Sequence, residues 1–355
     1  MPTATVNDRG IQFYYEDSGP LIGSYLTVVM VHGIAFNAAI YQLMFSAAEA
    51  HGLRIVAINR RDYPGSTPMS DDDITANGSP DNESWTEFFR QRAFEIGEFL
   101  AWFAQTQDIP KFSESETGKA EGGIALVSWS AGIRSTMGLM GFADRLPENT
   151  GKALDPYFRA FCLLDCPQSL LGIEAPGLYN PFYDFSLGDE RFKTFFAFID
   201  AHYDHADIHS GDVSTLTMQP RSTSPGTLTT MMPEEKGKVI TPVTSRSELL
   251  ITPGPVYYAM IKRMADKSTS DIWPRCKLKV FTCENSVWET VCSPWGLEKL
   301  CKEKERDGTL GKAFEMDWIP EGNHFDTALR YMPSVIDIIV IELIKDHDSG
   351  PACDG

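Results

Sequence analysis

The stretch Ser128-Trp129-Ser130-Ala131-Gly132 decides the fold of this chain. It follows the apolar run 124–127 and leads into a second apolar-patterned run over 133–140. A buried strand, a sharp turn of small residues and a helix form the context of a nucleophile elbow, which projects a serine hydroxyl out of a sheet. The helix N-terminus supplies backbone N–H groups that stabilise an oxyanion. The stretch therefore predicts Ser130 as a nucleophile, with Ser128 in place of the more usual glycine.

Composition and charge narrow the class of partner. The 355 residues are enough for one large α/β domain or a core domain with an insertion, and 43% hydrophobic with 23% charged residues is ordinary for a globular protein. The net charge of -18 argues against nucleic acid and anionic membranes as partners. No apolar run approaches the roughly 18 residues of a membrane-spanning helix, and the N-terminal residues do not resemble a secretory signal. The seven cysteines are scattered, which favours reduced thiols. We therefore expect a cytoplasmic protein that acts on a small molecule, in an oligomeric state that the sequence leaves open.

Apolar patterning predicts the fold class. Residues 4–18 alternate around a turn and predict an antiparallel hairpin. Short continuous apolar runs then alternate with helical patterns, as expected for a mostly parallel sheet flanked by helices, so we predict an α/β fold. The predicted strands are 26–31, 53–58, 124–128, 160–164, 278–282 and 314–319; the predicted helices are 85–105 and 333–345; and 66–84 and 113–122 are predicted surface loops.

One block of the chain does not follow this alternation. Residues 167–265 contain no convincing strand, many aromatic residues and a Ser/Thr/Pro-rich middle. We interpret the block as a mainly helical cap inserted into the α/β core. The expected domains are a first part of the core at 1–166, the cap at 167–265, a second part of the core at 266–345 and a polar tail at 346–355.

A serine nucleophile needs a base and an oxyanion hole. On an elbow of this kind the acid and the histidine follow the serine in that order. His324 comes just after the last predicted strand and is the expected base, the alternative being a histidine in a surface loop. The segment Val31-His32-Gly33-Ile34-Ala35 follows the first predicted parallel strand. The expected oxyanion donors are the backbone N–H groups of Ala131 and of either Ile34 or Ala35.

These residues together resemble the α/β-hydrolase superfamily. The matching segments are His32-Gly33, the Ser130 elbow, Gly322-Asn323-His324-Phe325, and residues 59–66, which are similar to the family's Asp-x-Arg-Gly-x-Gly-x-Ser loop. The resemblance covers nearly the whole chain outside the predicted cap. It implies the α/β-hydrolase fold and ester-type chemistry, but not one reaction, because this fold hosts many.

The acid departs from the pattern of the superfamily. Most members carry it in a Gly-x-x-Asp turn after the penultimate strand, and here that turn reads Cys283-Glu284-Asn285-Ser286, with serine at the expected aspartate position. A smaller set of relatives, including the zearalenone-type lactonases, takes the acid from the end of the preceding strand. This chain has Asp165 there. The resemblance therefore favours Asp165 as the acid, with Glu284 as the alternative.

Aromatic residues and histidines complete the list of candidates. Most aromatic residues of the predicted cap are expected to build its own small core, with two or three facing substrate. His202, His205 and His209 have the spacing of one helix face and would suit a metal, but a surface facing water is the favoured interpretation. There is no glycine-rich phosphate loop, so we expect no nucleotide cofactor, and no metal. The expected substrate-binding residues are Trp129, Tyr183, Phe185, Phe196 and Trp288.

The sequence thus predicts a serine hydrolase that cleaves a carboxylic ester or lactone of a hydrophobic small molecule through an acyl-enzyme. One alternative is a biosynthetic acyltransferase or cyclase that passes the same acyl group to an acceptor other than water. The other alternative is a binding protein that has the fold but no activity, because the turn that usually carries the acid is irregular.

Overall fold

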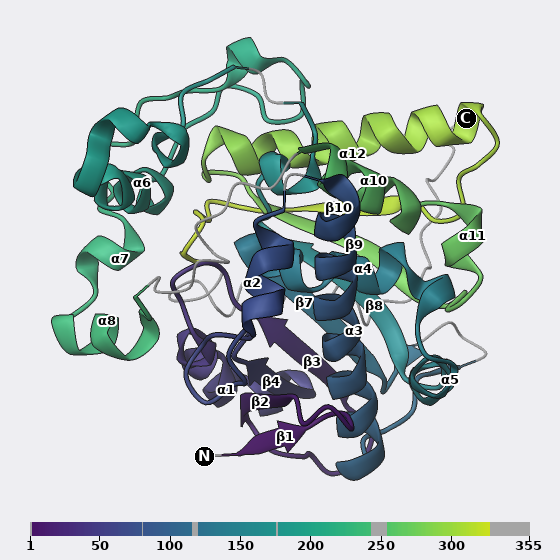
Figure 1. Cartoon of the computed structure of the whole chain (residues 1–355). Coiled ribbons are helices and arrows are strands. Elements are labelled where there is room, and N and C mark those ends of the chain that lie inside the picture. Colours follow the sequence, from purple (N-terminus) through teal and green to yellow (C-terminus); the bar gives the residue numbers. More distant parts are fainter. Residues whose placement is uncertain (1, 80, 116–119, 175–176, 243–253, 327–355) are drawn as a thin grey trace, which may run out of the picture.

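A mostly parallel sheet organises the protein (Figure 1). The computed structural model describes residues 2–79, 81–115, 120–174, 177–242 and 254–326. Within those residues one sheet has eight strands in the order β1-β2-β4-β3-β7-β8-β9-β10, and β5 and β6 form a separate small pair. The strands are β1 Thr3–Thr5, β2 Gln12–Asp17, β3 Leu26–Val31, β4 Leu53–Ile58, β5 Ser113–Glu114, β6 Ala120–Glu121, β7 Ile124–Trp129, β8 Phe158–Leu164, β9 Lys277–Cys283 and β10 Phe314–Ile319.

The strand directions confirm the predicted class. Strands β4, β3, β7, β8, β9 and β10 pair in parallel, whereas β1 and β2 form the predicted hairpin and β2 joins β4 in antiparallel fashion. Every residue of β3, β4, β7 and β8 is buried. Strands that are covered on both faces need apolar side chains on both, which is why they are continuous apolar runs in the sequence.

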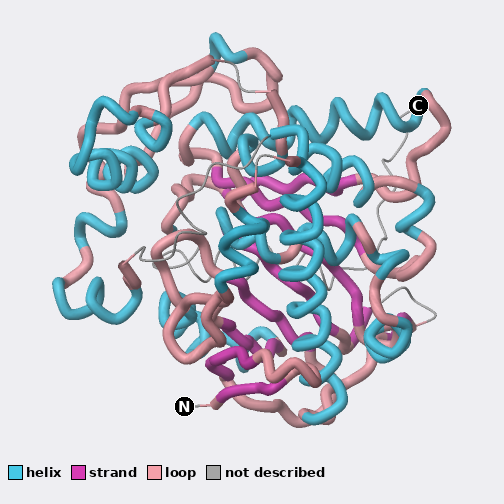
Figure 2. The backbone as a smooth tube through the Cα atoms, in the orientation of Figure 1, coloured by secondary structure: helices cyan, strands magenta, loops and turns pink. Residues whose placement is uncertain are grey.

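Alternate residues of each strand enter two separate cores. Val29 and Val31 of β3 pack in one core, and Val28 and Met30 pack in the other. This division follows from the two-residue period of a strand, which turns successive side chains to opposite faces of the sheet. Figure 2 shows the strands side by side with helices around them.

The helices cover both faces of the sheet. The first core takes residues from α3, α4, α10 and α12, and the second takes residues from α1. Helices α6, α7 and α8 lie to one side of the sheet in Figure 1. No described helix is long and apolar enough to cross a membrane. The helices are α1 Gln42–Ala48, α2 Asp71–Asn77, α3 Asn82–Thr106, α4 Met137–Gly141, α5 Glu148–Leu154, α6 Arg191–Asp200, α7 Thr227–Thr230, α8 Pro233–Val239, α10 Gly254–Met264, α11 Lys267–Ser270 and α12 Trp288–Arg306.

The structure of some predicted segments differs from the expectation. The stretch 66–84 is not loop throughout, because the Ser70 side chain and Asp73 form a capping box that starts α2. Helix α10 falls inside the block predicted as cap, but Met260 and Ile261 bury its apolar side in the first core. The predicted helix 333–345 and tail 346–355 lie outside the described residues.

Candidate active site

Ser130 stands on a sharp turn between β7 and the 3-10 helix Ser130–Ser135. Its φ of 52° lies in the left-handed region, which non-glycine residues rarely adopt. A Cβ atom added at Gly132 would lie 2.5 Å from the carbonyl oxygen of Val31, so this position admits only glycine without a shift of the backbone. The crowding between the turn and β3 explains why glycine stands at position 132.

His324 joins Ser130 to Asp165. The Nε2 atom of His324 lies 3.0 Å from Oγ of Ser130, and its Nδ1 atom lies 2.6 Å from Oδ2 of Asp165. Ser130 follows the end of β7, Asp165 follows the end of β8, and His324 lies in the loop after β10. Parallel strands bring their carboxyl ends to the same edge of a sheet, so three distant segments meet there. All three side chains are buried.

The Asp165 carboxylate is held by the turn after β9. The backbone N–H of Cys283 donates to Oδ1 at 3.0 Å, and the hydroxyl of Ser286 donates to Oδ2 at 2.7 Å. Ser286 is the residue at the position where most of the superfamily carries its acid. In this chain the turn therefore contributes a donor to the carboxylate rather than the carboxylate itself. Asp165 accepts hydrogen bonds on both oxygens, the arrangement that a buried carboxylate requires.

Glu284 does not take the place of Asp165. Its side chain is half-buried, and its backbone N–H donates to the carbonyl of Ile319 at 3.0 Å, which ties the turn to β10. Both ring nitrogens of His324 face other groups, Asp165 on one side and Ser130 on the other. The geometry therefore favours Asp165 over Glu284 as the partner of the imidazole.

Two of the three expected oxyanion donors lie at the cavity. Ile34 and Ala131 line the same small cavity as Ser130. The backbone N–H of Ala35, by contrast, donates to the hydroxyl of Tyr63 at 3.1 Å. This contact occupies the Ala35 donor, whereas Ile34 lines the cavity, so the geometry favours Ile34 over Ala35 as the candidate donor.

A basic residue supports the loop that carries Ile34. The guanidinium of Arg60 donates to the carbonyl of Gly33 at 3.1 Å and to the hydroxyl of Tyr63 at 3.2 Å. The backbone N–H of Arg60 donates to Nε2 of His32 at 3.1 Å. Burial, with a smaller contribution from the Arg60 charge, holds the pKa of His32 well below its usual range. A neutral His32 can accept that hydrogen bond, so the segment 59–66 anchors the loop before Ile34.

Trp129 is a correction to the expected substrate-binding residues. Its side chain is buried in the second core rather than in the cavity. The indole N–H donates to the backbone carbonyl of His324 at 3.1 Å, and the two rings lie 5.2 Å apart. Trp129 therefore supports the loop of His324 from beneath, a role that the elbow pattern alone did not indicate.

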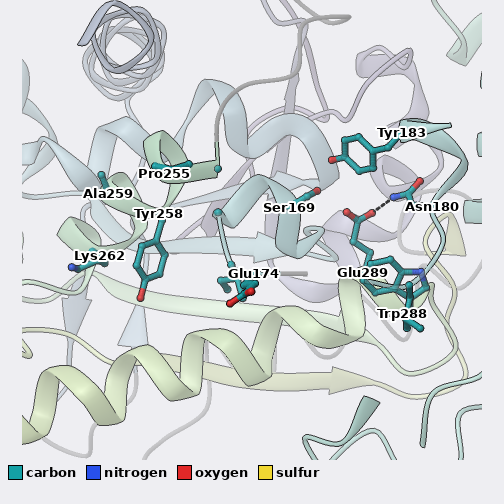
Figure 3. Close-up of a pocket in the computed structure, with 14 residues that line it drawn as sticks. Ser169, Glu174, Asn180, Tyr183, Pro255, Tyr258, Ala259, Lys262, Trp288 and Glu289 are labelled. Carbon is teal, nitrogen blue, oxygen red and sulfur yellow. Dashed lines mark hydrogen bonds between the residues drawn. The ribbon is translucent and has the colours of Figure 1, made fainter. Parts of the chain in front are cut away.

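The cavity at Ser130 has a volume of about 80 Å³. It adjoins an outer cavity of about 620 Å³, whose lining Figure 3 shows. Tyr183 lines both cavities, and Trp288 lines the outer one. Phe182 and Phe195 line the inner cavity although the sequence did not select them. They come from the same aromatic-rich segment, and spacing within an irregular segment does not show which side chain turns inward.

The two other predicted aromatic residues lie elsewhere. Phe196 packs against Phe36 and against the small apolar cluster that contains Ile34 and Ala131. It stands behind the inner cavity rather than in its lining. Phe185 is 64% exposed and lies under the guanidinium of Arg191. Phe185 lines neither the inner nor the outer cavity, and its role in substrate binding stays a prediction.

The three histidines of the metal hypothesis do not share a helix face. They lie in the loop after α6 and have separate partners. His202 Nε2 lies 2.9 Å from Oδ2 of Asp326, and His205 Nε2 lies 2.8 Å from the carbonyl of Ser286. The ring of His209 packs edge-on against Trp318. Within the described part of the chain, no group of His, Cys, Asp or Glu side chains is arranged to hold a metal ion.

Glu289 is a candidate that no sequence pattern indicates. It lies in the first turn of α12, is only 5% exposed and lines the inner cavity together with Ser130. Burial raises the pKa of its carboxyl to about 7, and hydrogen bonds with Ser169 and Asn180 offset that rise only in part. A glutamate in an ordinary helical segment has no pattern that reveals such burial.

The raised pKa makes stability depend on pH. Below about pH 4.5 the Glu289 carboxyl is protonated in both folded and unfolded chains. Between there and about pH 7 the unfolded chain releases its proton while the folded chain keeps it, so the free energy of unfolding falls as pH rises. We expect Glu289→Gln to gain about 3 kcal/mol relative to the wild type across this window, and no more above it. Urea unfolding at a series of pH values measures the difference.

The matched control for this experiment is Glu298→Gln on the same helix. The Glu298 side chain is 59% exposed and pairs with Lys302 on the surface. Its difference from the wild type should stay flat over the same pH range. A flat difference for Glu289→Gln as well would contradict the raised pKa.

Comparison with known proteins adds to this geometry. No protein-family model matches the chain, and no curated protein matches it by sequence. Among solved structures, Est816, described as an N-acyl homoserine lactone degrading enzyme, superposes with a TM-score of 0.50 at 14% identity, over 97% of this chain and 100% of its own. The chain has the α/β-hydrolase fold.

Other α/β-hydrolase structures are similar over most of their length. The enol-lactonase from Burkholderia xenovorans LB400 has a TM-score of 0.46 at 11% identity, over 95% of this chain and 99% of its own. An esterase from Exiguobacterium antarcticum has a TM-score of 0.46 at 13% identity, over 97% and 100%. In this α/β-hydrolase fold the order Ser130, Asp165, His324 along the chain is the order in which the fold's triads run.

Proposed function

We propose that the protein is a serine hydrolase that cleaves carboxylic esters or lactones through an acyl-enzyme. The observation that carries this proposal is the chain of contacts from Ser130 through His324 to Asp165, at 3.0 Å and 2.6 Å, beside a cavity. A serine hydroxyl becomes a nucleophile when a base within hydrogen-bond reach takes its proton and a third group orients that base.

The chemistry follows from these positions. His324 Nε2 takes the proton from Ser130 as Oγ attacks the substrate carbonyl carbon, and the tetrahedral oxyanion accepts hydrogen bonds from the N–H groups of Ile34 and Ala131. The imidazolium returns the proton to the departing alkoxide, which leaves an acyl-Ser130 ester. Water that gives its proton to His324 then attacks that ester, and the imidazolium returns the proton to Oγ of Ser130 as the C–O bond to the acyl group breaks and the acid leaves. Asp165 orients the ring and stabilises its positive charge.

The inner cavity supports a substrate with an apolar part. Ile34, Leu170, Phe182 and Phe195 line it, and these side chains favour apolar groups near the reacting carbonyl. Lactones belong in the test beside open-chain esters, because Est816, which has a similar fold, is an N-acyl homoserine lactone degrading enzyme.

Reaction with a fluorophosphonate tests the proposal. The probe mimics the tetrahedral intermediate and reacts with serines that a nearby base activates. We expect one label per chain, on the peptide that contains Ser130, and hydrolysis of at least one class in a panel of aryl esters, alkyl esters and lactones. Mass spectrometry locates the label and a pH-stat measures hydrolysis. An unlabelled wild-type protein would overturn the proposal.

A further inference from the structure

The inner and outer cavities share one polar wall. Ser169, Asn180, Tyr183 and Glu289 line both of them, and we call these four residues the polar neck. Ser169 lies in the 3-10 helix Gln168–Leu171, Tyr183 ends the 3-10 helix Pro181–Tyr183, and Glu289 begins α12. Figure 3 shows the neck at one end of the outer cavity, with Pro255, Tyr258, Ala259 and Lys262 of α10 at the other.

The groups of the neck contact one another. The Asn180 amide donates to Oε2 of Glu289 at 2.5 Å (Figure 3). Ser169 and Tyr183 line both cavities beside this pair. Glu289 and Asn180 are both buried. The neck therefore presents a hydroxyl, an amide, a phenol and a carboxyl between two largely apolar chambers.

The Asn180 amide is held from both ends: its oxygen accepts from the backbone N–H of Phe182, and its NH₂ group donates to Glu289. Burying polar groups costs free energy unless each finds partners, and an apolar wall here would avoid that cost. A carboxyl whose pKa is close to neutrality can donate a hydrogen bond when protonated and accept one when ionised. Such a group, lining the passage between the nucleophile and the larger chamber, suits recognition of an oxygen atom in a ligand.

We propose that the polar neck binds a hydroxyl or carbonyl group of the substrate several bonds away from the carbonyl that Ser130 attacks. The proposal rests on the proposed function and names a substrate class for it: oxygenated esters or lactones whose reacting end enters the inner cavity and whose remaining, largely apolar part occupies the outer one. The difference between about 80 and about 620 Å³ assigns the larger part to the outer cavity.

Matched substrates test the proposal. Aryl esters of straight-chain acids are compared with their chain-end hydroxyl and keto analogues, and the ratio of kcat/KM for each pair is measured. We expect the wild type to prefer the oxygenated ester by about tenfold or more, the value of one to two buried hydrogen bonds. Glu289→Leu and Asn180→Leu should bring the ratio close to one, because each removes polar groups from the neck.

Two further variants accompany the measurement of substrate preference. Glu298→Gln, on the exposed side of α12, should keep the wild-type ratio. If Glu289→Leu does not fold, Glu289→Gln is measured in its place. The glutamine retains a donor and an acceptor, so this variant should keep part of the preference for the oxygenated ester. Fluorophosphonate labelling at the wild-type rate reports an intact Ser130 site in each variant.

The outcomes separate this inference from the proposed function. No label and no hydrolysis of any ester would overturn both. Hydrolysis with a wild-type ratio near one, or a preference that survives in both Glu289→Leu and Asn180→Leu, would overturn the polar subsite alone and leave the serine hydrolase in place.

Discussion

Replacing Asp165 with asparagine is expected to lower kcat about 10⁴-fold, the loss seen when a triad acid becomes an amide. Both carboxylate oxygens of Asp165 face donors: Oδ1 faces the Cys283 N–H, and Oδ2 faces His324 Nδ1 and the Ser286 hydroxyl. An amide has one acceptor and one donor end, so either orientation sets an NH₂ group against a donor. If the NH₂ group faces Nδ1 of His324, the imidazole is driven to the tautomer with its proton on Nε2. That tautomer cannot take the proton of Ser130.

Steady-state kinetics separates this effect from a loss of binding. Asp165 is fully buried behind His324, so its replacement should act on kcat and leave KM largely unchanged. Glu284→Gln is the matched control and should retain wild-type kinetics, because its carboxyl lies in the neighbouring turn. A large loss in Glu284→Gln with little loss in Asp165→Asn would reverse the assignment of the acid.

Replacing Ser130 with alanine is expected to abolish fluorophosphonate labelling and to lower kcat by roughly 10⁵-fold or more. In the proposed mechanism Oγ of Ser130 is the atom that carries the acyl group. Without it, only direct attack of water on the substrate in the oxyanion site remains. Alanine fits the elbow as serine does, since it differs from serine only by the missing hydroxyl group. Thermal unfolding should therefore stay close to that of the wild type.

Ser128, two residues before Ser130, provides a matched control for this variant. The Ser128 hydroxyl lies 2.6 Å from that of Thr136 and faces the interior of the elbow. Thr136 keeps backbone partners at Gly132 and Ile133 when that contact is removed. Ser128→Ala should thus label at nearly the wild-type rate. Turnover by Ser130→Ala at the wild-type rate would exclude the acyl-enzyme.

Local patterns sufficed for the parts of the fold that depend on local burial. The bounds of β3 and β4 agree with the runs 26–31 and 53–58, because a strand covered on both faces must be apolar at every position. The elbow was also readable, since small residues around Ser130 reflect a steric demand within one turn. The apolar pattern of the segment did not reveal that α10 packs in the first core, because the sequence of an amphipathic helix does not show which neighbour its apolar side covers.

The sequence by itself determined the α/β class, the elbow at Ser130 and the position of His324 after the last described strand. Only the tertiary structure decided that Asp165 rather than Glu284 faces the imidazole, that Ser286 donates to it, and that Ile34 rather than Ala35 faces the cavity. The buried Glu289 beside Ser130 was likewise invisible in the sequence. The physical reason is the same in each case: these contacts join residues far apart in the chain, and periodicity records which side of an element is buried but not which partner covers it.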